Sequence, residues 1–150
     1  MDDYRQIENL IYRYAELIDA GDLAGVAGLF HHAEIISKAH NTTRTGVDEV
    51  LQMYQRSCRL HEPSGTPLTK HLTTNVIIEM GACRTEASAR SYYTVIQATS
   101  SLPLQPIISG RYADRFRKID TRWEFACREM IVDLIGDCSA HLLYDTSGLK

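Results

Sequence analysis

The order of two hydrophobic periodicities along the chain limits its possible folds most strongly. Between residues 7 and 60 apolar side chains recur at the spacing of amphipathic helices, whereas between residues 71 and 133 they follow strand-like runs. Helices that precede a series of strands are typical of α+β folds, in which the helices lie on one face of an antiparallel sheet. The chain is therefore expected to pack N-terminal helices on a strongly curved, mostly antiparallel sheet.

The first two helices are indicated by their apolar stripes and their ends. The stripe of the first helix consists of Ile7, Leu10, Ile11, Tyr14, Leu17 and Ile18. Gly21 fits the C-terminal end of this helix, because glycine adopts the left-handed conformation of helix ends at little cost. Asp22 can cap a second helix over residues 22–30 by accepting hydrogen bonds from free backbone N–H groups.

A third helix and five strands complete the predicted order. A short strand at Glu34–Ser37 and a turn at Thr45-Gly46 precede a helix over residues 47–60, whose inward side chains are expected to be Val47, Val50, Leu51 and Tyr54. A loop rich in Pro and Gly follows at residues 61–69. Four longer strands are then predicted at residues 71–80, 86–99, 106–119 and 123–133, with a turn at Asp120-Thr121.

Size and composition exclude several functional classes. A chain of 150 residues with 44% hydrophobic content can form one core, so a single domain over residues 1–150 is expected. Its formal charge of −3 is a poor match for nucleic acid. No apolar run approaches the roughly 18 residues of a membrane span, and the charged N-terminus differs from a signal peptide. The four cysteines form no CxxC motif, so reduced thiols and a cytoplasmic location are expected.

The strand that begins at His71 is the first candidate for a functional site. Strict alternation places Leu72, Thr74, Val76 and Ile78 on one face, and His71, Thr73, Asn75 and Ile77 on the other. One interpretation is a half-solvated strand with a surface histidine. The other is a pocket lined by polar groups, in which His71 acts as a general base near neutral pH.

Three more polar side chains each allow a structural and a functional interpretation. Tyr14 lies at the centre of its helical stripe, so its hydroxyl needs a partner, either in the core or in a pocket. Asp19 lies on the flank of that stripe near the helix end, where a carboxylate opposes the helix dipole, so it is either a solvated carboxylate or one that another group fixes in place. Arg128 shares a strand face with apolar residues, which indicates a partner anion, either a structural carboxylate or a substrate oxygen.

Other motifs are weaker. His31 and His32 lack a third ligand at metal spacing and no HExxH motif is present, so no metal site is expected. Residues 136–141 include Asp, Ser and His but no GxSxG motif, which argues against a hydrolase triad. No glycine-rich nucleotide motif occurs, and no cofactor is expected. The tail after Gly136 is expected to be loose or to pack on a partner subunit.

Several segments resemble SnoaL-like proteins of the nuclear-transport-factor-like superfamily, which have a cystatin-like fold. They are residues 7–22, Leu29-Phe30, His71-x-x-x-Asn75, Ser109-Gly110-Arg111-Tyr112-x-Asp114-x-Phe116 and Trp123-x-Phe125-x-x-Arg128. The resemblance covers nearly the whole chain in the expected order. It implies a cone-shaped α+β fold with an internal pocket. Within the superfamily, the chain is most similar to the branch of scytalone dehydratase, bile-acid dehydratase and hexachlorocyclohexane dehydrochlorinase.

This resemblance implies a set of catalytic residues. In that branch an aspartate late in the first helix pairs with a histidine on the strand after the third helix, and these positions correspond to Asp19 and His71. The inward tyrosine of the dehydratases corresponds to Tyr14, and the arginine of the last strand corresponds to Arg128. Asn75 is expected to bind substrate.

The expected substrate-binding set also includes Tyr54, Tyr92 and Tyr93. The dehydratases carry a second His or an Asp on the strand after the catalytic histidine, whereas residues 91–97 here offer only hydroxyls and an amide. Either the substrate differs, or Tyr92 or Tyr93 provides the polar group that the second His or Asp provides in the dehydratases.

The implied activity is that of a cofactor-free lyase of the dehydratase type. Its substrate would be a small, apolar, cyclic carbonyl compound such as a polyketide or steroid fragment, with no metal required. An isomerase or cyclase could use the same residues. A third interpretation is a non-catalytic ligand-binding protein or accessory subunit, since the same fold serves as the small subunit of ring-hydroxylating oxygenases. A homodimer or homotrimer is expected, because strands with one well-patterned face often bury the other by self-association.

Overall fold

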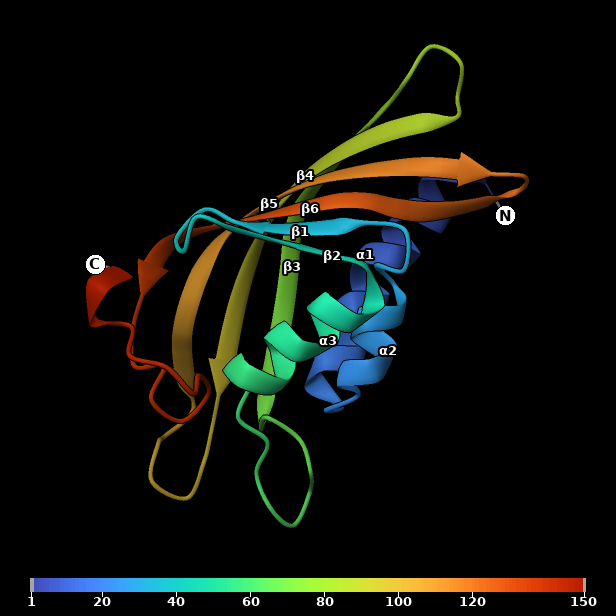
Figure 1. Ribbon diagram of the computed structural model, residues 1–150. Coiled ribbons are helices and arrows are strands. Elements are labelled where there is room, and N and C mark those ends of the chain that lie inside the picture. Colours follow the sequence, from blue (N-terminus) through green and yellow to red (C-terminus); the bar gives the residue numbers. More distant parts are fainter. Residues whose placement is uncertain (1, 150) are drawn as a thin grey trace.

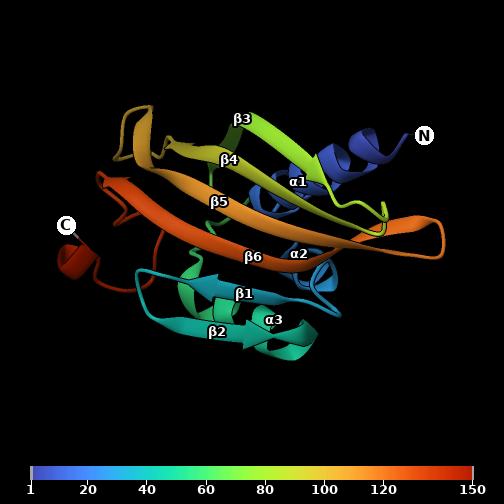
Figure 2. The same cartoon turned by 90° about the horizontal axis from the view of Figure 1, so that it is seen from above.

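The computed structural model describes residues 2–149 and consists of helices on one face of a single curved sheet (Figures 1 and 2). Its elements are α1 (Asp3–Asp19), α2 (Leu23–Gly28), β1 (Glu34–Ser37), β2 (Thr42–Thr45), α3 (Gly46–Ser57), β3 (Thr69–Met80), β4 (Glu86–Gln97), β5 (Gln105–Ile119), β6 (Arg122–Ile135) and the 3₁₀ turn η1 (Ser147–Leu149). The strand order is β2-β1-β6-β5-β4-β3. Only β1 and β6 pair in parallel, so the predicted α+β architecture with a mostly antiparallel sheet is confirmed.

Helix α1 forms where its sequence predicts and covers β3 and β6. It begins after Asp2, whose carboxylate accepts hydrogen bonds from the backbone N–H groups of Tyr4 and Arg5. Gly21 follows it with a φ of 75°, and a Cβ at this position would lie 2.2 Å from the carbonyl oxygen of Gly65. Only glycine therefore allows the loop after α3 to approach the end of α1.

The structure departs from the local predictions at two elements in the first part of the chain. Helix α3 ends at Ser57 instead of continuing to residue 60, and Val47 is exposed on its surface. The hairpin strand β2 was not predicted, because it lies at the edge of the sheet and contains only Thr and Arg. A strand without an apolar face has no periodicity that would distinguish it from a loop.

Strand β3 departs from strict alternation at a β-bulge between Thr74 and Ile77. Asn75 has a φ of 54° there, and the bulge exchanges the two faces of the strand. Before the bulge His71 is partly buried and Leu72 is exposed, and after it Ile78 is again partly buried. The prediction that Leu72 and Ile78 share a face was therefore wrong. The bulge allows one strand to turn His71 inward near its start and aliphatic side chains inward near its end.

The first part of the segment after β6 packs against the same chain, so residues 136–142 are not the loose tail that was expected there. The carbonyl oxygen of Ala140 accepts hydrogen bonds from the side chains of Gln97, at 3.1 Å, and His61, at 2.7 Å. The thiol of Cys138 donates to the carbonyl oxygen of Ile107 at 3.2 Å. Residues 136–142 therefore connect the ends of α3, β4 and β5.

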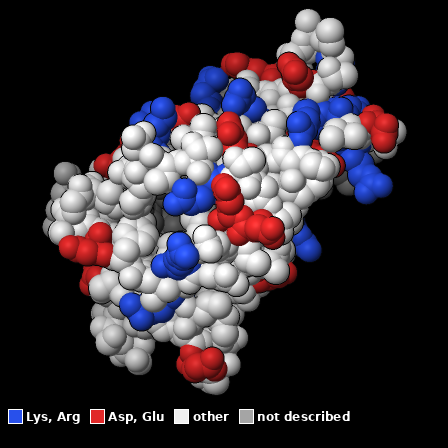
Figure 3. Space-filling model, viewed as in Figure 1, with Lys and Arg blue, Asp and Glu red and all other residues white. Residues whose placement is uncertain are grey.

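The surface carries charges of both signs, interspersed over the face seen in Figure 3. None of the helices within residues 2–149 is both long and apolar enough to cross a membrane. The four cysteines are all free thiols, and Cys83 alone among them is exposed.

Candidate functional site

Asp19, at the end of α1, and His71, near the start of β3, form a hydrogen-bonded pair. Nδ1 of His71 lies 2.6 Å from Oδ1 of Asp19, and the backbone N–H of His71 donates to Oδ2 at 2.8 Å. The hydroxyl of Thr69 also donates to Oδ1, at 2.8 Å. The two side chains are only 9% and 6% exposed. Three donors therefore hold the carboxylate in one orientation.

These contacts define the protonation pattern of the pair. Burial raises the pKa of Asp19, but the hydrogen bonds from His71 and Thr69 outweigh it and leave the pKa below its ordinary value. An ionised Asp19 accepts a proton-bearing Nδ1, so the lone pair of neutral His71 is on Nε2. Within residues 2–149 no group is hydrogen-bonded to this Nε2. The arrangement can therefore accept a proton from a bound molecule.

A surface hollow of about 470 Å³ lies against the pair, at the seam between α1 and the edge strand β3. Its lining consists of Tyr12, Ala15, Glu16, Asp19, Ala20, Lys70, His71 and Thr73. This open hollow differs from the enclosed pocket that the resemblance implied. The reason is that aromatic side chains fill the space between the sheet and the helices beside His71.

Several of the aromatic side chains that fill the space beside His71 are tyrosines. The hydroxyls of Tyr14 and Tyr54 lie 2.7 Å apart, and the rings of Tyr14 and His71 are nearly perpendicular at a centroid distance of 6.5 Å. The ring of Tyr93 stacks on Tyr112 at 4.5 Å. Burial raises the pKa values of these tyrosines, so they are neutral hydrogen-bonding groups. Tyr54 and Tyr93, both expected to bind substrate, are core side chains here.

The anion that partners Arg128 is a structural carboxylate and not a substrate oxygen. Its Nε and Nη2 donate to the two carboxylate oxygens of Asp114, each at 2.8 Å, and both side chains are fully buried. The guanidinium also lies 4.3 Å from the ring centre of Tyr14. The expected catalytic position of Arg128 is not observed, because the ion pair and the rings separate it from solvent.

Two other predicted site residues lie away from the pair. Asn75 is exposed at the bulge of β3, where its left-handed backbone turns it away from His71. Tyr92 is 53% exposed, because it alternates along β4 with the buried Tyr93. Neither of these two side chains, which were expected to bind substrate, belongs to the lining of the hollow beside Asp19 and His71. Asp19, His71, Tyr14 and Tyr54 are the predicted residues that the fold brings together.

Comparison with known proteins now assigns the family. Residues 1–129 match the SnoaL-like domain. The chain belongs to the SnoaL-like family. None of the curated proteins compared with it matches.

Solved structures share the fold of this SnoaL-like chain. A variant of Rv3472 from Mycobacterium tuberculosis, of unknown function, has a TM-score of 0.71 and 26% identity over 89% of this chain and 73% of that chain. A structure described as "Putative Scytalone Dehydratase" from Novosphingobium aromaticivorans has a TM-score of 0.68 and 28% identity, over 88% and 85% of the two chains. A protein of unknown function with a cystatin-like fold from Nostoc punctiforme has a TM-score of 0.71 and 23% identity, over 87% and 91%.

Beyond the part that matches the SnoaL-like domain, the C-terminal segment adds a residue that the sequence reasoning missed. His141 is 6% exposed, and its ring centre lies 6.0 Å from that of His71. Burial, together with the nearby His71, lowers the pKa of His141 to about 4, so it is neutral near pH 7. Its Nδ1 is buried without a hydrogen-bond partner in the described chain. The only sequence signal was a His in a segment considered for a hydrolase triad.

Proposed function

We propose that this SnoaL-like protein is a cofactor-free lyase that removes water from a small, apolar, cyclic carbonyl compound by acid–base catalysis. The observation that carries the proposal is the contact of 2.6 Å between Asp19 and His71, with Nε2 of His71 left unbonded. A histidine held in this tautomer by a carboxylate is a suitable general base near neutral pH. The 28% identity to the Novosphingobium structure supports the dehydratase reaction over other acid–base chemistries.

In the proposed reaction, Nε2 of His71 removes a proton from the carbon next to the substrate carbonyl. The electron pair of that C–H bond moves toward the carbonyl oxygen and gives an enolate. As the pair returns, the bond between the β-carbon and its hydroxyl breaks and a carbon–carbon double bond forms. The imidazolium of His71 gives its proton to the departing hydroxyl, which leaves as water. Asp19 stabilises the imidazolium in between, and such catalysis contributes roughly 10²–10⁴-fold.

His141 supplies the second imidazole of this proposal. A buried N–H without an acceptor costs more than a bare ring nitrogen, so the proton of neutral His141 is placed on Nε2 rather than on Nδ1. Nε2–H can then donate a hydrogen bond to the carbonyl oxygen as negative charge develops on it. A neutral imidazole suits this role, because it polarises a carbonyl without competing for the proton that His71 removes. His141 would thus replace the second His or Asp that β4 lacks.

Tyr14 and Arg128 support the site in different ways. Tyr14 is the candidate hydrogen-bond donor to the leaving hydroxyl: when the hydroxyl of Tyr54 donates to that of Tyr14 across their contact of 2.7 Å, the proton of Tyr14 is free to donate. Arg128 is a positioning residue, which holds the ring of Tyr14 by a cation–π contact at 4.3 Å.

The test is turnover of cyclic β-hydroxy ketones by the wild type and by His71→Ala, with loss of water followed by mass spectrometry. We expect water loss with the wild type, no detectable turnover with the folded variant, and no effect of EDTA. Glu79→Gln, on the same strand but exposed and beyond the bulge, is the matched control and should retain activity. A folded, active His71→Ala protein would contradict the proposal. A product of unchanged mass would instead identify an isomerase that uses the same pair.

A further inference from the structure

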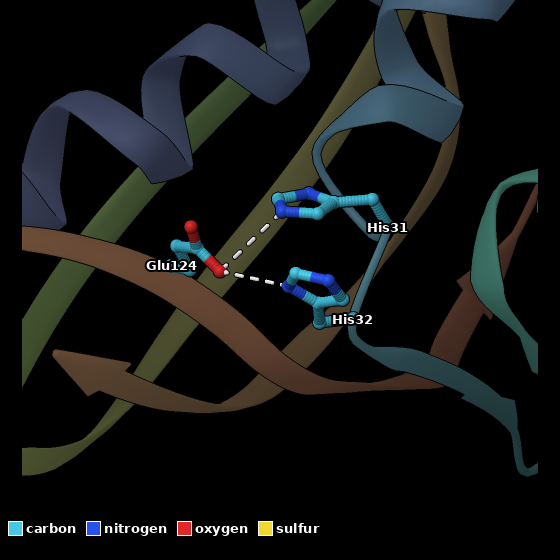
Figure 4. Close-up of side chains that lie close together, drawn as sticks. All are labelled: His31, His32 and Glu124. Carbon is cyan, nitrogen blue, oxygen red and sulfur yellow. Dashed lines mark hydrogen bonds and ion pairs between the residues drawn. The ribbon is translucent and has the colours of Figure 1, made fainter. Parts of the chain in front are cut away.

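Three side chains outside the proposed active site converge on one point at the surface (Figure 4). His31 and His32 lie in the turn after α2, and Glu124 lies near the start of β6. Oε2 of Glu124 is 3.5 Å from Nε2 of His31 and 3.4 Å from Nδ1 of His32. The sequence offered no third ligand to the two histidines, because 92 residues separate Glu124 from His32. That expectation rested on spacing along the sequence, whereas the fold places Glu124 beside both rings.

The spacing of these atoms matches a metal site better than a hydrogen-bonded cluster. Strong hydrogen bonds between such atoms span about 2.7–3.2 Å, which is shorter than both contacts. Zinc binds His nitrogen and carboxylate oxygen at about 2.0–2.2 Å, so neighbouring ligands of a tetrahedral ion lie about 3.3–3.6 Å apart. All three ligand atoms lie within 4.8 Å of one another. A small movement of the exposed rings is enough to complete the geometry.

The second ring nitrogen of His31 supports this interpretation independently. Nδ1 of His31 lies 3.0 Å from the carbonyl oxygen of Gly28, a contact in which Nδ1 must carry the proton. Neutral His31 therefore directs the lone pair of Nε2 at the carboxylate of Glu124. Two acceptors facing each other require a cation between them, or a proton on the ring. Metal-binding histidines commonly donate their other N–H to a backbone carbonyl in this way.

We propose that His31, His32 and Glu124 bind one divalent transition-metal ion, of which Zn²⁺ fits the ligand set best. The remaining coordination position is open to water, since the two histidine side chains are 41% and 58% exposed. The bound ion connects the turn after α2 to β6, two segments far apart in the chain. The site shares no residue with the proposed active site, and an ion that joins these two segments stabilises the folded chain.

The test is titration of metal-free protein with ZnCl₂ by isothermal calorimetry, together with thermal unfolding. We expect one Zn²⁺ per chain and a raised melting temperature, and Glu124→Gln should weaken binding by at least about tenfold. Glu129→Gln, on the same strand but outside the cluster, is the matched control, and Cys83→Ser excludes binding by the exposed thiol. His31→Asn gives a second route if Glu124→Gln fails to fold.

Equal Zn²⁺ affinity in the wild type, Glu124→Gln and His31→Asn would overturn the proposal, as would the absence of binding at millimolar Zn²⁺. Loss of binding in both variants, with binding retained in Glu129→Gln, would support it. The readout is binding and not turnover. A failure of zinc binding therefore leaves the acid–base proposal for Asp19 and His71 unaffected. Likewise, a failure of the acid–base proposal leaves the zinc site unaffected.

Discussion

The guanidinium of Arg128 binds both carboxylate oxygens of Asp114 at 2.8 Å, and neither side chain reaches solvent. Asp114→Asn should lower the free energy of unfolding by about 3–5 kcal/mol, because it leaves a buried positive charge without its counter-ion. Urea unfolding followed by circular dichroism measures this. The double variant Asp114→Leu with Arg128→Met should recover most of the loss, since it removes both charges. A loss below about 1 kcal/mol in the single variant would contradict this account.

The hydroxyl pair of Tyr14 and Tyr54 should behave as a coupled unit. Tyr14→Phe leaves the buried hydroxyl of Tyr54 without the partner 2.7 Å away, which should cost about 1–3 kcal/mol of unfolding free energy. Removing both hydroxyls should cost less than the sum of the two single changes. A double-mutant cycle by urea unfolding tests this. Strict additivity would show that the two hydroxyls do not depend on each other.

The burial of His141 predicts a pH dependence of stability. In the unfolded chain this imidazole takes up a proton below pH 6.5, whereas in the folded protein it does so only near pH 4. Its contribution is therefore fully present above pH 6.5 and is lost as the pH falls toward 4. One pKa unit corresponds to roughly 1.4 kcal/mol, so the wild type should lose about 3 kcal/mol more than His141→Gln between pH 7 and 4.

The measurement is urea unfolding of both proteins at pH 7, 5.5 and 4. The groups around His141 that also titrate or carry charge are His71, Asp19 and His61, and all three remain in the variant. The difference between the two proteins therefore reports on His141. Parallel stability profiles for the wild type and the variant would rule out a buried, neutral His141.

Asp19→Asn should release His71 from its single tautomer. In the wild type, ¹⁵N chemical shifts should show the proton on Nδ1 and a lone pair on Nε2, because the carboxylate accepts from Nδ1. In the variant both tautomers should be populated, and turnover should fall by roughly 10²–10⁴-fold. An unchanged tautomer in Asp19→Asn would mean that another group orients the ring.

The ionised carboxylate of Asp19 should also stabilise the folded protein at neutral pH. The pKa of folded Asp19 lies below its ordinary value of 3.8, so its contribution is present above that pH and is lost as the pH falls through the folded pKa. The wild type should therefore be more stable than Asp19→Asn at pH 7. The gap should narrow below about pH 4 in acid unfolding curves. A gap that widens in acid would contradict the hydrogen-bonding pattern around Asp19.

Periodicity predicted the parts of the fold that bury one continuous face. Helix α1 and the strands β4 and β5 have such faces, and their predicted and observed bounds agree closely. Strand β3 shows where this reasoning fails. The conformation of Asn75 shifts the alternation by one position, and no hydrophobic pattern encodes the conformation of a single residue in advance.

In the candidate site, too, some contacts were predictable from the sequence and others were not. The hydrogen bond between Asp19 and His71 was expected from the family resemblance, because both positions belong to motifs that recur in order. The position of His141 was not, since it depends on how residues 136–142 fold back on the ends of α3, β4 and β5. The approach of Glu124 to His31 and His32 likewise depends on the pairing of distant strands. Contacts of this kind are set by tertiary packing, which spacing in the sequence does not reveal.

The parallel pairing of β1 with β6 has a consequence for the order of folding. Glu34 pairs with Cys127, so β1 finds its parallel neighbour β6 only after more than half of the chain has been made. During synthesis, α2 and the hairpin of β1 and β2 leave the ribosome with their apolar surface uncovered. Topologies dominated by distant contacts fold slowly, and such surface is exposed to aggregation meanwhile. Residues 136–142 follow β6 in the chain, so the contact of His141 with His71 can form only after β6 has been made.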